Sequence, residues 1–149
     1  FMIDYKFFDT SAILELTSNV DKPIYKSSIT LKEIENIKIS NNKSEEVKYK
    51  ARRIIKQIDE HPELYRIHFY KEHMLDPIIN ADLPINDDMK ILATAIDFDN
   101  NYHPDEVIFV SNDISLKNIA NLFFGNGCIQ SIKLTSSYYS GFKQINMTE

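Results

Sequence analysis

Residues 5–14 read YKFFDTSAIL, and the fold is built outward from this stretch. Its first half is an apolar run typical of a buried strand, and the run ends on the carboxylate of Asp9. Two hydroxyl residues, Thr10 and Ser11, come next, and a helical turn is expected from residue 11 to residue 16. A carboxylate at the carboxyl end of a strand does not fill a core. Asp9 therefore either caps the following helix or points into a cleft.

Strand-like and helix-like segments alternate along the rest of the chain. The apolar runs that predict strands cover residues 5–8, 24–29, 65–69, 106–111 and 128–134. The segments with helical spacing cover residues 31–38, 44–59, 87–98 and 115–124, and Pro77 and Pro84 bracket an expected loop. Such alternation predicts an α/β fold, a three-layer α/β/α sandwich with a central, mainly parallel sheet.

Composition excludes several classes of protein. With 149 residues, 43% of them apolar, the chain has enough core for one compact domain. No apolar run approaches the ~20 residues of a membrane-spanning helix, so no membrane partner is expected. The net charge of −5 argues against a broadly basic nucleic-acid binder. A cleft built from several carboxylates would account for most of that deficit.

Cysteine content and the first residues bear on the cellular context. Cys128 is the single cysteine, which excludes an internal disulfide framework and fits a reducing cytoplasm. The N-terminus lacks the basic and apolar pattern of a secretory signal. The chain opens on Phe1 rather than Met, which favours a segment cut from a longer protein or a product that follows a tag.

Four acids occupy strand ends or helix starts: Asp9, Glu33, Asp88 and Asp113. Because the carboxyl ends of parallel strands share one edge of a sheet, Asp9 and Asp113 are expected at the same rim. Four carboxylates gathered there would repel one another and raise their pKa values unless cations screened them. Mg²⁺ and Mn²⁺ prefer oxygen ligands of this kind. Composition and periodicity alone do not select these four from the 22 acidic residues.

A resemblance to a known family does select them. KFFDTSAIL looks like the opening Asp-Thr-Asn/Ser motif of PIN domains, and ITLKEIENIK is similar to their strand followed by Glu. DMKILATA resembles their Asp-x-x-Ile/Leu-x-Ala helix, and VIFVSNDISLKNIA resembles their final strand with Ser/Thr-Asn-Asp. The four motifs come in the family's order and cover roughly residues 5 to 135.

The resemblance implies a Mg²⁺- or Mn²⁺-dependent ribonuclease that cleaves single-stranded RNA with a metal-activated water. The family's acidic catalytic positions fall on Asp9, Glu33, Asp88 and Asp113. Asp9, Asp88 and Asp113 would bind the metal, and Glu33 would help to position a metal or the attacking water. The polar side chains that would support these carboxylates or their waters are Ser11, Ser111 and Asn112.

Two segments point to one branch of the family. SNDISLKNIA and the later YYSGFKQI are especially similar to the PIN domain that precedes the ATPase in PhoH-like proteins. No Gly-rich phosphate loop of an ATPase occurs in this chain. The resemblance implies a nuclease domain over residues 1–135. Residues 136–149 would be a tail, or the start of a linker to a C-terminal ATPase domain. Dimers are common among PIN domains, so a homo-oligomer is also expected.

Each acid also has a purely structural interpretation. Asp9 suits an N-terminal cap. Glu33 is the third residue after Thr30 in a plausible capping box, and its neighbour Glu35 is a rival for the site. We favour Glu33 because it lies nearer the start of its helix, and hence nearer the rim of the sheet.

The last two acids have rivals as well. Asp88 shares a helical stripe with Leu92 and Ile96 and is expected to lean toward the protein, whereas Asp87 is expected to lean outward. Both also suit a helix N-terminus electrostatically. Asp113 could instead cap the helix that follows it, unless Ser115 does so.

A basic strip on the long helix has two interpretations. Lys48, Arg52 and Lys56 recur at four-residue spacing. They form either a solvated face that balances Glu45 and Glu46, or a strip that contacts RNA phosphates.

Two other functions remain open at the level of the whole chain. One is a non-catalytic PIN domain that binds RNA or serves assembly. The other is a toxin ribonuclease of a toxin–antitoxin pair.

Overall fold

One parallel sheet organises the molecule. A computed structural model describes residues 4–18, 20–102, 106–125 and 128–132. The five strands are β1 (Asp4–Phe8), β2 (Ile24–Ser27), β3 (Tyr65–His68), β4 (Glu106–Val110) and β5 (Ile129–Gln130). They lie in the order β3-β2-β1-β4-β5, and every neighbouring pair is parallel. The predicted parallel sheet is confirmed.

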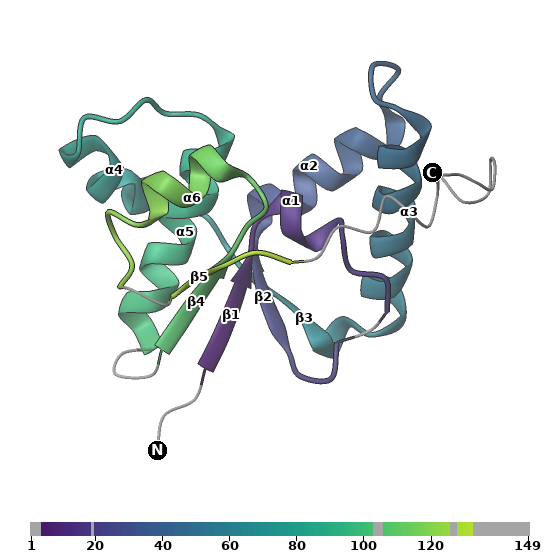
Figure 1. The fold of residues 1–149 in the computed structure, drawn as a ribbon, viewed down its shortest axis with the longest axis horizontal. Helices are drawn as coiled ribbons and strands as arrows, with labels where there is room; N and C mark the ends of the chain where they lie inside the picture. Colours follow the sequence, from purple (N-terminus) through teal and green to yellow (C-terminus); the bar gives the residue numbers. More distant parts are fainter. Residues whose placement is uncertain (1–3, 19, 103–105, 126–127, 133–149) are drawn as a thin grey trace.

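Helices cover both faces of this sheet, as the predicted three-layer sandwich requires (Figure 1). The α-helices are α1 (Thr10–Ile13), α2 (Ser28–Ile39), α3 (Glu45–Glu60), α4 (Asp76–Asn80), α5 (Asp87–Tyr102) and α6 (Ile114–Ala120). Two short 3₁₀ helices, η1 (Pro62–Leu64) and η2 (Glu72–Leu75), join them. Helices α1 to α3 pack on one face, and α4 to α6 pack on the other.

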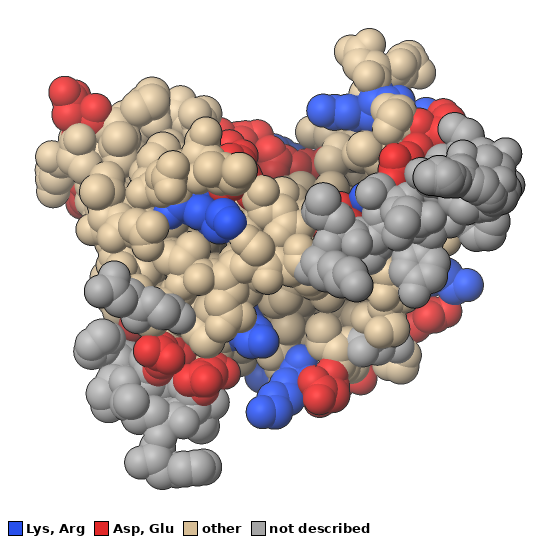
Figure 2. Space-filling model, in the orientation of Figure 1, with Lys and Arg blue, Asp and Glu red and all other residues tan. Residues whose placement is uncertain are grey.

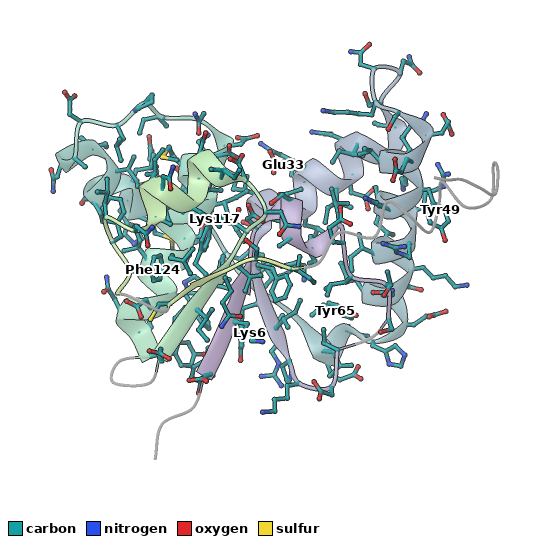
Figure 3. All side chains as sticks on the ribbon, in the orientation of Figure 1. Lys6, Glu33, Tyr49, Tyr65, Lys117 and Phe124 are labelled. Carbon is teal, nitrogen blue, oxygen red and sulfur yellow. The ribbon has the colours of Figure 1, made fainter. Side chains whose placement is uncertain are left out.

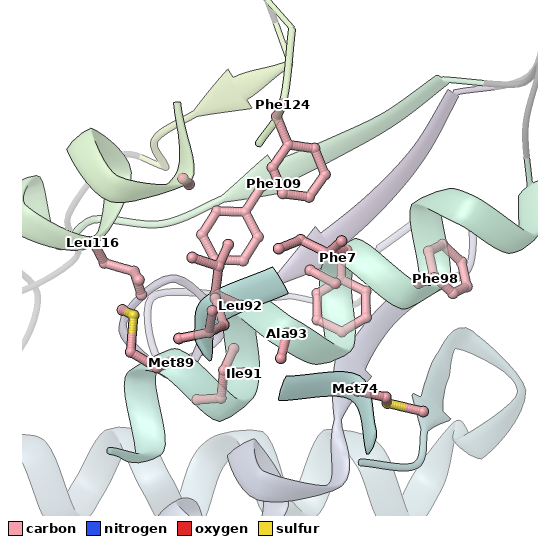
Figure 4. Packing of buried hydrophobic residues seen from close by; sticks show 14 of the residues in the cluster. Phe7, Met74, Met89, Ile91, Leu92, Ala93, Phe98, Phe109, Leu116 and Phe124 are labelled. Atoms are coloured by element: carbon pink, nitrogen blue, oxygen red, sulfur yellow. The ribbon is translucent and has the colours of Figure 1, made fainter. Parts of the chain in front are cut away.

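The alternation of side chains along β1 divides the core in two. Phe7 faces α5 and packs with Phe109 and Phe98 in the larger cluster (Figure 4). Phe8 points to the opposite face and joins Ile34 and Ile54 of α2 and α3. Consecutive residues of a strand point to opposite faces, so a strand covered on both sides is a continuous apolar run. This explains why Phe7 and Phe8, two consecutive residues of β1, are both apolar and buried.

Several boundaries differ from those expected. Helix α2 begins at Ser28, so β2 is two residues shorter than predicted. The cause is Ser27, whose Oγ accepts a hydrogen bond of 3.1 Å from the backbone N–H of Ile29 and so caps the helix. Pro77 was expected in a loop but lies in the first turn of α4, where a missing N–H costs nothing.

The last helix and the last strand are shorter than predicted. Helix α6 ends at Ala120, and β5 covers only Ile129–Gln130. Residues 133–134 of the predicted last strand and the whole expected tail, 136–149, lie outside the described residues. Within the described part of the chain, no helix combines the length and apolar character needed to cross a bilayer.

The strand order determines where a ligand would bind. From β1 the chain continues to β2 and β3 on one side, then crosses to β4 and β5 on the other. The direction of winding therefore reverses between β1 and β4. In open parallel sheets, ligands bind beyond the carboxyl ends of the strands at such a switch point. The residue after β1 is Asp9, and the residues after β4 are Ser111, Asn112 and Asp113.

Candidate active site

Asp9 lies beside the end of β4 because the two strands are in register. Phe8 pairs with Val110, and the N–H of Asp9 donates to the Val110 carbonyl at 3.0 Å. Asp9 is only 2% exposed, and its Oδ1 accepts a 2.8 Å bond from the N–H of Ala12, which caps α1. The capping interpretation is therefore correct, but it uses only part of the carboxylate.

Two serines satisfy most of the remaining acceptor capacity of Asp9. Ser111 Oγ donates to Oδ2 at 2.5 Å, and Ser11 Oγ lies 2.8 Å and 3.0 Å from Oδ1 and Oδ2. Ser11 has one hydroxyl proton, so Asp9 receives three protons from Ala12, Ser11 and Ser111. An ionised carboxylate offers about four acceptor sites. About one site is left for a further partner.

Glu33 reaches the same site from α2. Thr10 Oγ1 donates to Glu33 Oε1 at 2.5 Å, which joins the residue after Asp9 to the second acid. Figure 3 labels Glu33, which lies on α2 beside α1. Because α2 begins at Ser28, Glu33 lies in its second turn, and the capping-box interpretation is wrong. The rival Glu35 is exposed and pairs with a lysine on its own helix.

Asp87 and Asp88 begin α5. Asn86 caps the N-terminus of this helix, because its side-chain oxygen accepts a 2.9 Å hydrogen bond from the N–H of Met89. Asp88 is the more exposed of the two, so the expectation that Asp88 leans inward and Asp87 outward is wrong. The physical reason is Lys32 of α2, whose Nζ lies 3.6 Å from Oδ2 of Asp87. This pair occupies Asp87 and leaves Asp88 without a cationic partner in the described part of the chain.

Asp113 caps α6, and Ser115 does not. Its Oδ1 accepts a 3.1 Å bond from the N–H of Leu116. Its own N–H donates to Ser111 Oγ at 3.0 Å, so Ser111 connects Asp113 with Asp9.

Asn112 supports this arrangement through its backbone and its amide. Its N–H donates to Ser11 Oγ at 2.9 Å, and its side-chain oxygen accepts a 2.9 Å bond from the N–H of Ile132. Ser11, Ser111 and Asn112 thus join the ends of β1, β4 and β5 around the first acid.

Burial raises the pKa of Asp9 and of Glu33 above the usual carboxyl range. For Asp9, loss of hydration is the largest effect, and the hydrogen bonds from Ser111 and Ala12 oppose it. For Glu33, loss of hydration is again the largest effect, and the hydrogen bond from Thr10 opposes it. Both acids therefore keep their negative charge at a free-energy cost.

Asp88 links the acids electrostatically. Its own pKa is raised first by loss of hydration and then by the negative charges of Asp113 and Asp87. In turn, the charge of Asp88 raises the pKa values of Asp9 and Glu33. Asp88 is thus the common neighbour through which the other three predicted acids are linked electrostatically.

A cavity of about 470 Å³ opens at this site. Figure 2 shows acidic side chains gathered in the notch between the two groups of helices. The lining residues are Thr10, Ser11, Leu14, Glu33, Asn36, Ile37, Ser40, Lys43, Val47, Asp87 and Asp88. Asp9 contributes through Ser11, which lines the cavity and donates to the Asp9 carboxylate.

The donor set fits a hard divalent cation by its chemistry. All four predicted acids offer oxygen, and a bound cation would offset the repulsion that raises the pKa values of Asp9, Glu33 and Asp88. Over the described ranges, no three His, Cys, Asp or Glu side chains are close enough to hold an ion between them. Mg²⁺ does not require such a cage, because it usually keeps several waters and binds through one or two carboxylates plus substrate phosphate.

The predicted basic strip lies outside this cavity. Lys48, Arg52 and Lys56 of α3 are absent from its lining, and Lys48 pairs with Glu45 at 3.5 Å. This supports the solvated-face interpretation for Lys48.

The sequence assigned no role in the site to Thr10 or Lys43, and it favoured Asp88 over Asp87. Thr10 had a local signal, since it directly follows Asp9 in the motif. The roles of Asp87 and Lys43 depend on how α5 and α3 pack against α2, and no local pattern reports that packing.

Comparison with known proteins identifies the family. A family model for the PIN domain matches residues 7–123. No curated protein matched the chain, and no solved structure did. The match covers the end of β1 and all of β2, β3 and β4, and it includes the four predicted acids. The chain therefore belongs to the PIN domain family, whose members are generally metal-dependent nucleases.

Proposed function

We propose that this PIN domain is a Mg²⁺- or Mn²⁺-dependent endoribonuclease that cleaves single-stranded RNA. The observation that carries the proposal is the electrostatic coupling of Asp9, Glu33, Asp88 and Asp113 beside one open cavity. An uncompensated carboxylate cluster lowers stability, so its presence at a ligand-binding position indicates a functional role.

The residues have distinct proposed roles. Asp9, Asp88 and Asp113 would hold the ion, partly through the waters that it keeps, and a divalent ion bound there would supply Lewis acidity and lower the pKa of a bound water. Glu33 would orient the attacking water and accept its proton. A raised pKa suits a general base that works near neutral pH. Thr10 donates to one Glu33 oxygen and so orients the other.

The test is cleavage of a single-stranded RNA by the wild type and by Asp9→Asn in the presence of Mn²⁺. We expect Asp9→Asn to lose activity by about 10²-fold or more, because an amide is a poor ligand for a hard dication. Circular dichroism checks that the variant remains folded. Asp59→Asn, on the exposed end of α3, is the matched control and should retain full activity. Equal cleavage by Asp9→Asn and the wild type would reject the assignment.

A second candidate is a non-catalytic PIN domain that binds RNA or serves assembly. It is favoured by the observation that no three of the described metal-binding side chains are at coordinating distance. Calorimetric titration with Mn²⁺ distinguishes the two functions. No binding at millimolar Mn²⁺, together with retained RNA binding, would favour the second candidate.

The PhoH-like assignment is a finer proposal. It is supported by the similarity of SNDISLKNIA and YYSGFKQI to the PIN domain that precedes an ATPase. It would place the chain in the cytoplasm with a C-terminal ATPase domain. A homo-oligomer is also proposed, because dimers are common among PIN domains. A toxin ribonuclease with an antitoxin partner is the competing proposal. The complete reading frame decides between them: an ATPase downstream supports the first, and a short free-standing frame beside an antitoxin supports the second.

A further inference from the structure

The cavity extends from the acids along one side of α2. The residues of α2 that line it are Glu33, Asn36 and Ile37, together with Ser40, the C-cap of the helix. They recur at i, i+3, i+4 and i+7, so they form one continuous stripe of the helix. From residue 33 to residue 40 the helix rises about 10 Å. The far end of this α2 groove is formed by Lys43 and Val47.

Lys43 is the one cationic residue in the lining of the groove, and its side chain is exposed. Neighbouring lysines are paired with carboxylates: Lys38 lies 3.0 Å from Glu35, and Lys48 lies 3.5 Å from Glu45. Lys43 has no ion pair with any residue that the structure describes. Its charge is therefore available to a ligand in the groove.

The backbone around Lys43 is held on both sides. Ser40 Oγ accepts a 3.1 Å bond from the N–H of Asn42, and Ser44 Oγ accepts a 3.3 Å bond from the N–H of Val47. The second bond caps α3, so Lys43 directly precedes a capped helix. The hydrogen bonds on either side fix the backbone of this short connection, from which the Lys43 side chain extends.

The wall of the groove combines apolar and polar groups. Leu14, Ile37 and Val47 provide apolar surface, and Asn36 provides an amide that can both donate and accept. The volume of about 470 Å³ falls within the ~300–1,000 Å³ typical of small-ligand pockets. Apolar surface for a base or sugar, an amide and a separate cation are the groups that a nucleotide would use.

We propose that the α2 groove binds the nucleotide adjacent to the cleaved bond and that Lys43 binds the phosphate of that nucleotide. This inference rests on the proposed function, because it places the cleaved phosphate at the acids. One end of the groove carries the acids, where the cleaved phosphate would lie with the metal ion, and the other end carries Lys43. A ligand with a single phosphate would therefore occupy only one of these two ends. The ~10 Å stripe exceeds the ~3.4 Å advance of one stacked nucleotide, so the strand must lie unstacked and extended in the groove for its next phosphate to meet the flexible side chain of Lys43.

The experiment compares two substrates with Mn²⁺ present. One is a single-stranded homopolymer RNA oligonucleotide, and the other is a dinucleoside monophosphate, which contains only the bond to be cleaved. For the oligonucleotide, we expect Lys43→Ala to raise KM by about three- to tenfold with little change in kcat. The salt dependence of binding should fall by about 0.7 in slope, the value for one phosphate contact on a single strand. Cleavage of the dinucleoside monophosphate should be unchanged.

Two further variants isolate the charge. Lys43→Arg should retain the wild-type KM, because it keeps the cation. Lys22→Ala removes an exposed lysine from the cavity at the opposite edge of the sheet and should have no effect.

The outcomes separate the two proposals. Wild-type cleavage with Lys43→Ala indistinguishable from Lys22→Ala would overturn the groove assignment and leave the nuclease function intact. An equal effect of Lys43→Ala on both substrates would also overturn it. Lack of cleavage by the wild type, with RNA binding that still depends on Lys43, would reject the nuclease function and support the groove. If the wild type neither cleaves RNA nor binds it in a way that depends on Lys43, both the nuclease function and the groove assignment are rejected.

Discussion

Ser111 is a buried hydroxyl that connects two acids of the site. It donates to Asp9 at 2.5 Å and accepts from the N–H of Asp113 at 3.0 Å. We predict that Ser111→Ala lowers the free energy of unfolding by about 1–3 kcal/mol, because it leaves the part-buried N–H of Asp113 without this partner and removes the shortest hydrogen bond to the buried Asp9 carboxylate. RNA cleavage should fall by about 10–100-fold, as expected for a residue that orients a metal-binding carboxylate.

The matched control for this prediction is Ser27→Ala. Ser27 is also fully buried and also makes two hydrogen bonds, to the N–H of Ile29 and to the hydroxyl of Thr94, but it touches none of the acids. Its loss should cost similar stability and leave cleavage intact. The pH dependence gives a second measurement. The hydrogen bond from Ser111 lowers the pKa of Asp9, so Ser111→Ala should move the rise in activity to higher pH. An unmoved profile would contradict the role.

At the scale of elements, β2 carries a lysine with no exposed surface. Lys26 is 0% exposed, and its Nζ donates to the Tyr65 carbonyl of β3 at 2.8 Å. Burial lowers its pKa to about 8. Above that value the folded protein loses a proton that the unfolded chain keeps until about pH 10.4. Stability from this group therefore rises with pH across that interval.

We predict that Lys26→Met raises the free energy of unfolding at pH 7 by about 2–3 kcal/mol, because it removes the cost of burying a charge. The advantage should shrink as the pH rises above 8, where the wild-type amine becomes neutral in the folded state. Urea unfolding at several pH values measures the difference, with the exposed Lys56→Met as control. A constant difference between pH 7 and pH 10 would contradict burial of a charged amine.

At the scale of the whole molecule, the acid cluster lowers stability in the absence of a cation. Carboxyls with raised pKa values destabilise the folded state once the pH exceeds those values. We predict that Asp88→Asn raises the Tm at neutral pH without metal. Saturating Mn²⁺ should raise the wild-type Tm by about 3–8 °C, because an ion that binds only the folded state stabilises it.

Thermal unfolding with and without Mn²⁺, and with a chelator, measures both effects. The increase caused by Mn²⁺ should be much smaller in Asp88→Asn, since that residue is the common neighbour of the other acids. Asp59→Asn should respond like the wild type. Equal increases in wild type and Asp88→Asn would show that the ion binds elsewhere.

The parts of the fold that follow from local patterns were predictable. The apolar runs before Asp9 and before Ser111 are strands in the structure, and their alternation with helices is enough to indicate a parallel sheet. The start of α2 was misplaced, because Ser27 rather than Thr30 caps the helix, and the apolar residues that follow Ser27 fit a strand as well as a helix.

By itself, the sequence determined the α/β class, because the class depends on the types and order of neighbouring residues. The acids of the candidate site were predicted through the resemblance of four motifs to those of PIN domains. Only the tertiary structure decided that Asp87 pairs with Lys32, that the charge of Asp88 acts on Asp9 and Glu33, and that Lys43 lies at the end of the α2 groove. The physical reason is that charge interactions and cavities arise between elements that pack together. Distance along the chain does not report which surfaces meet.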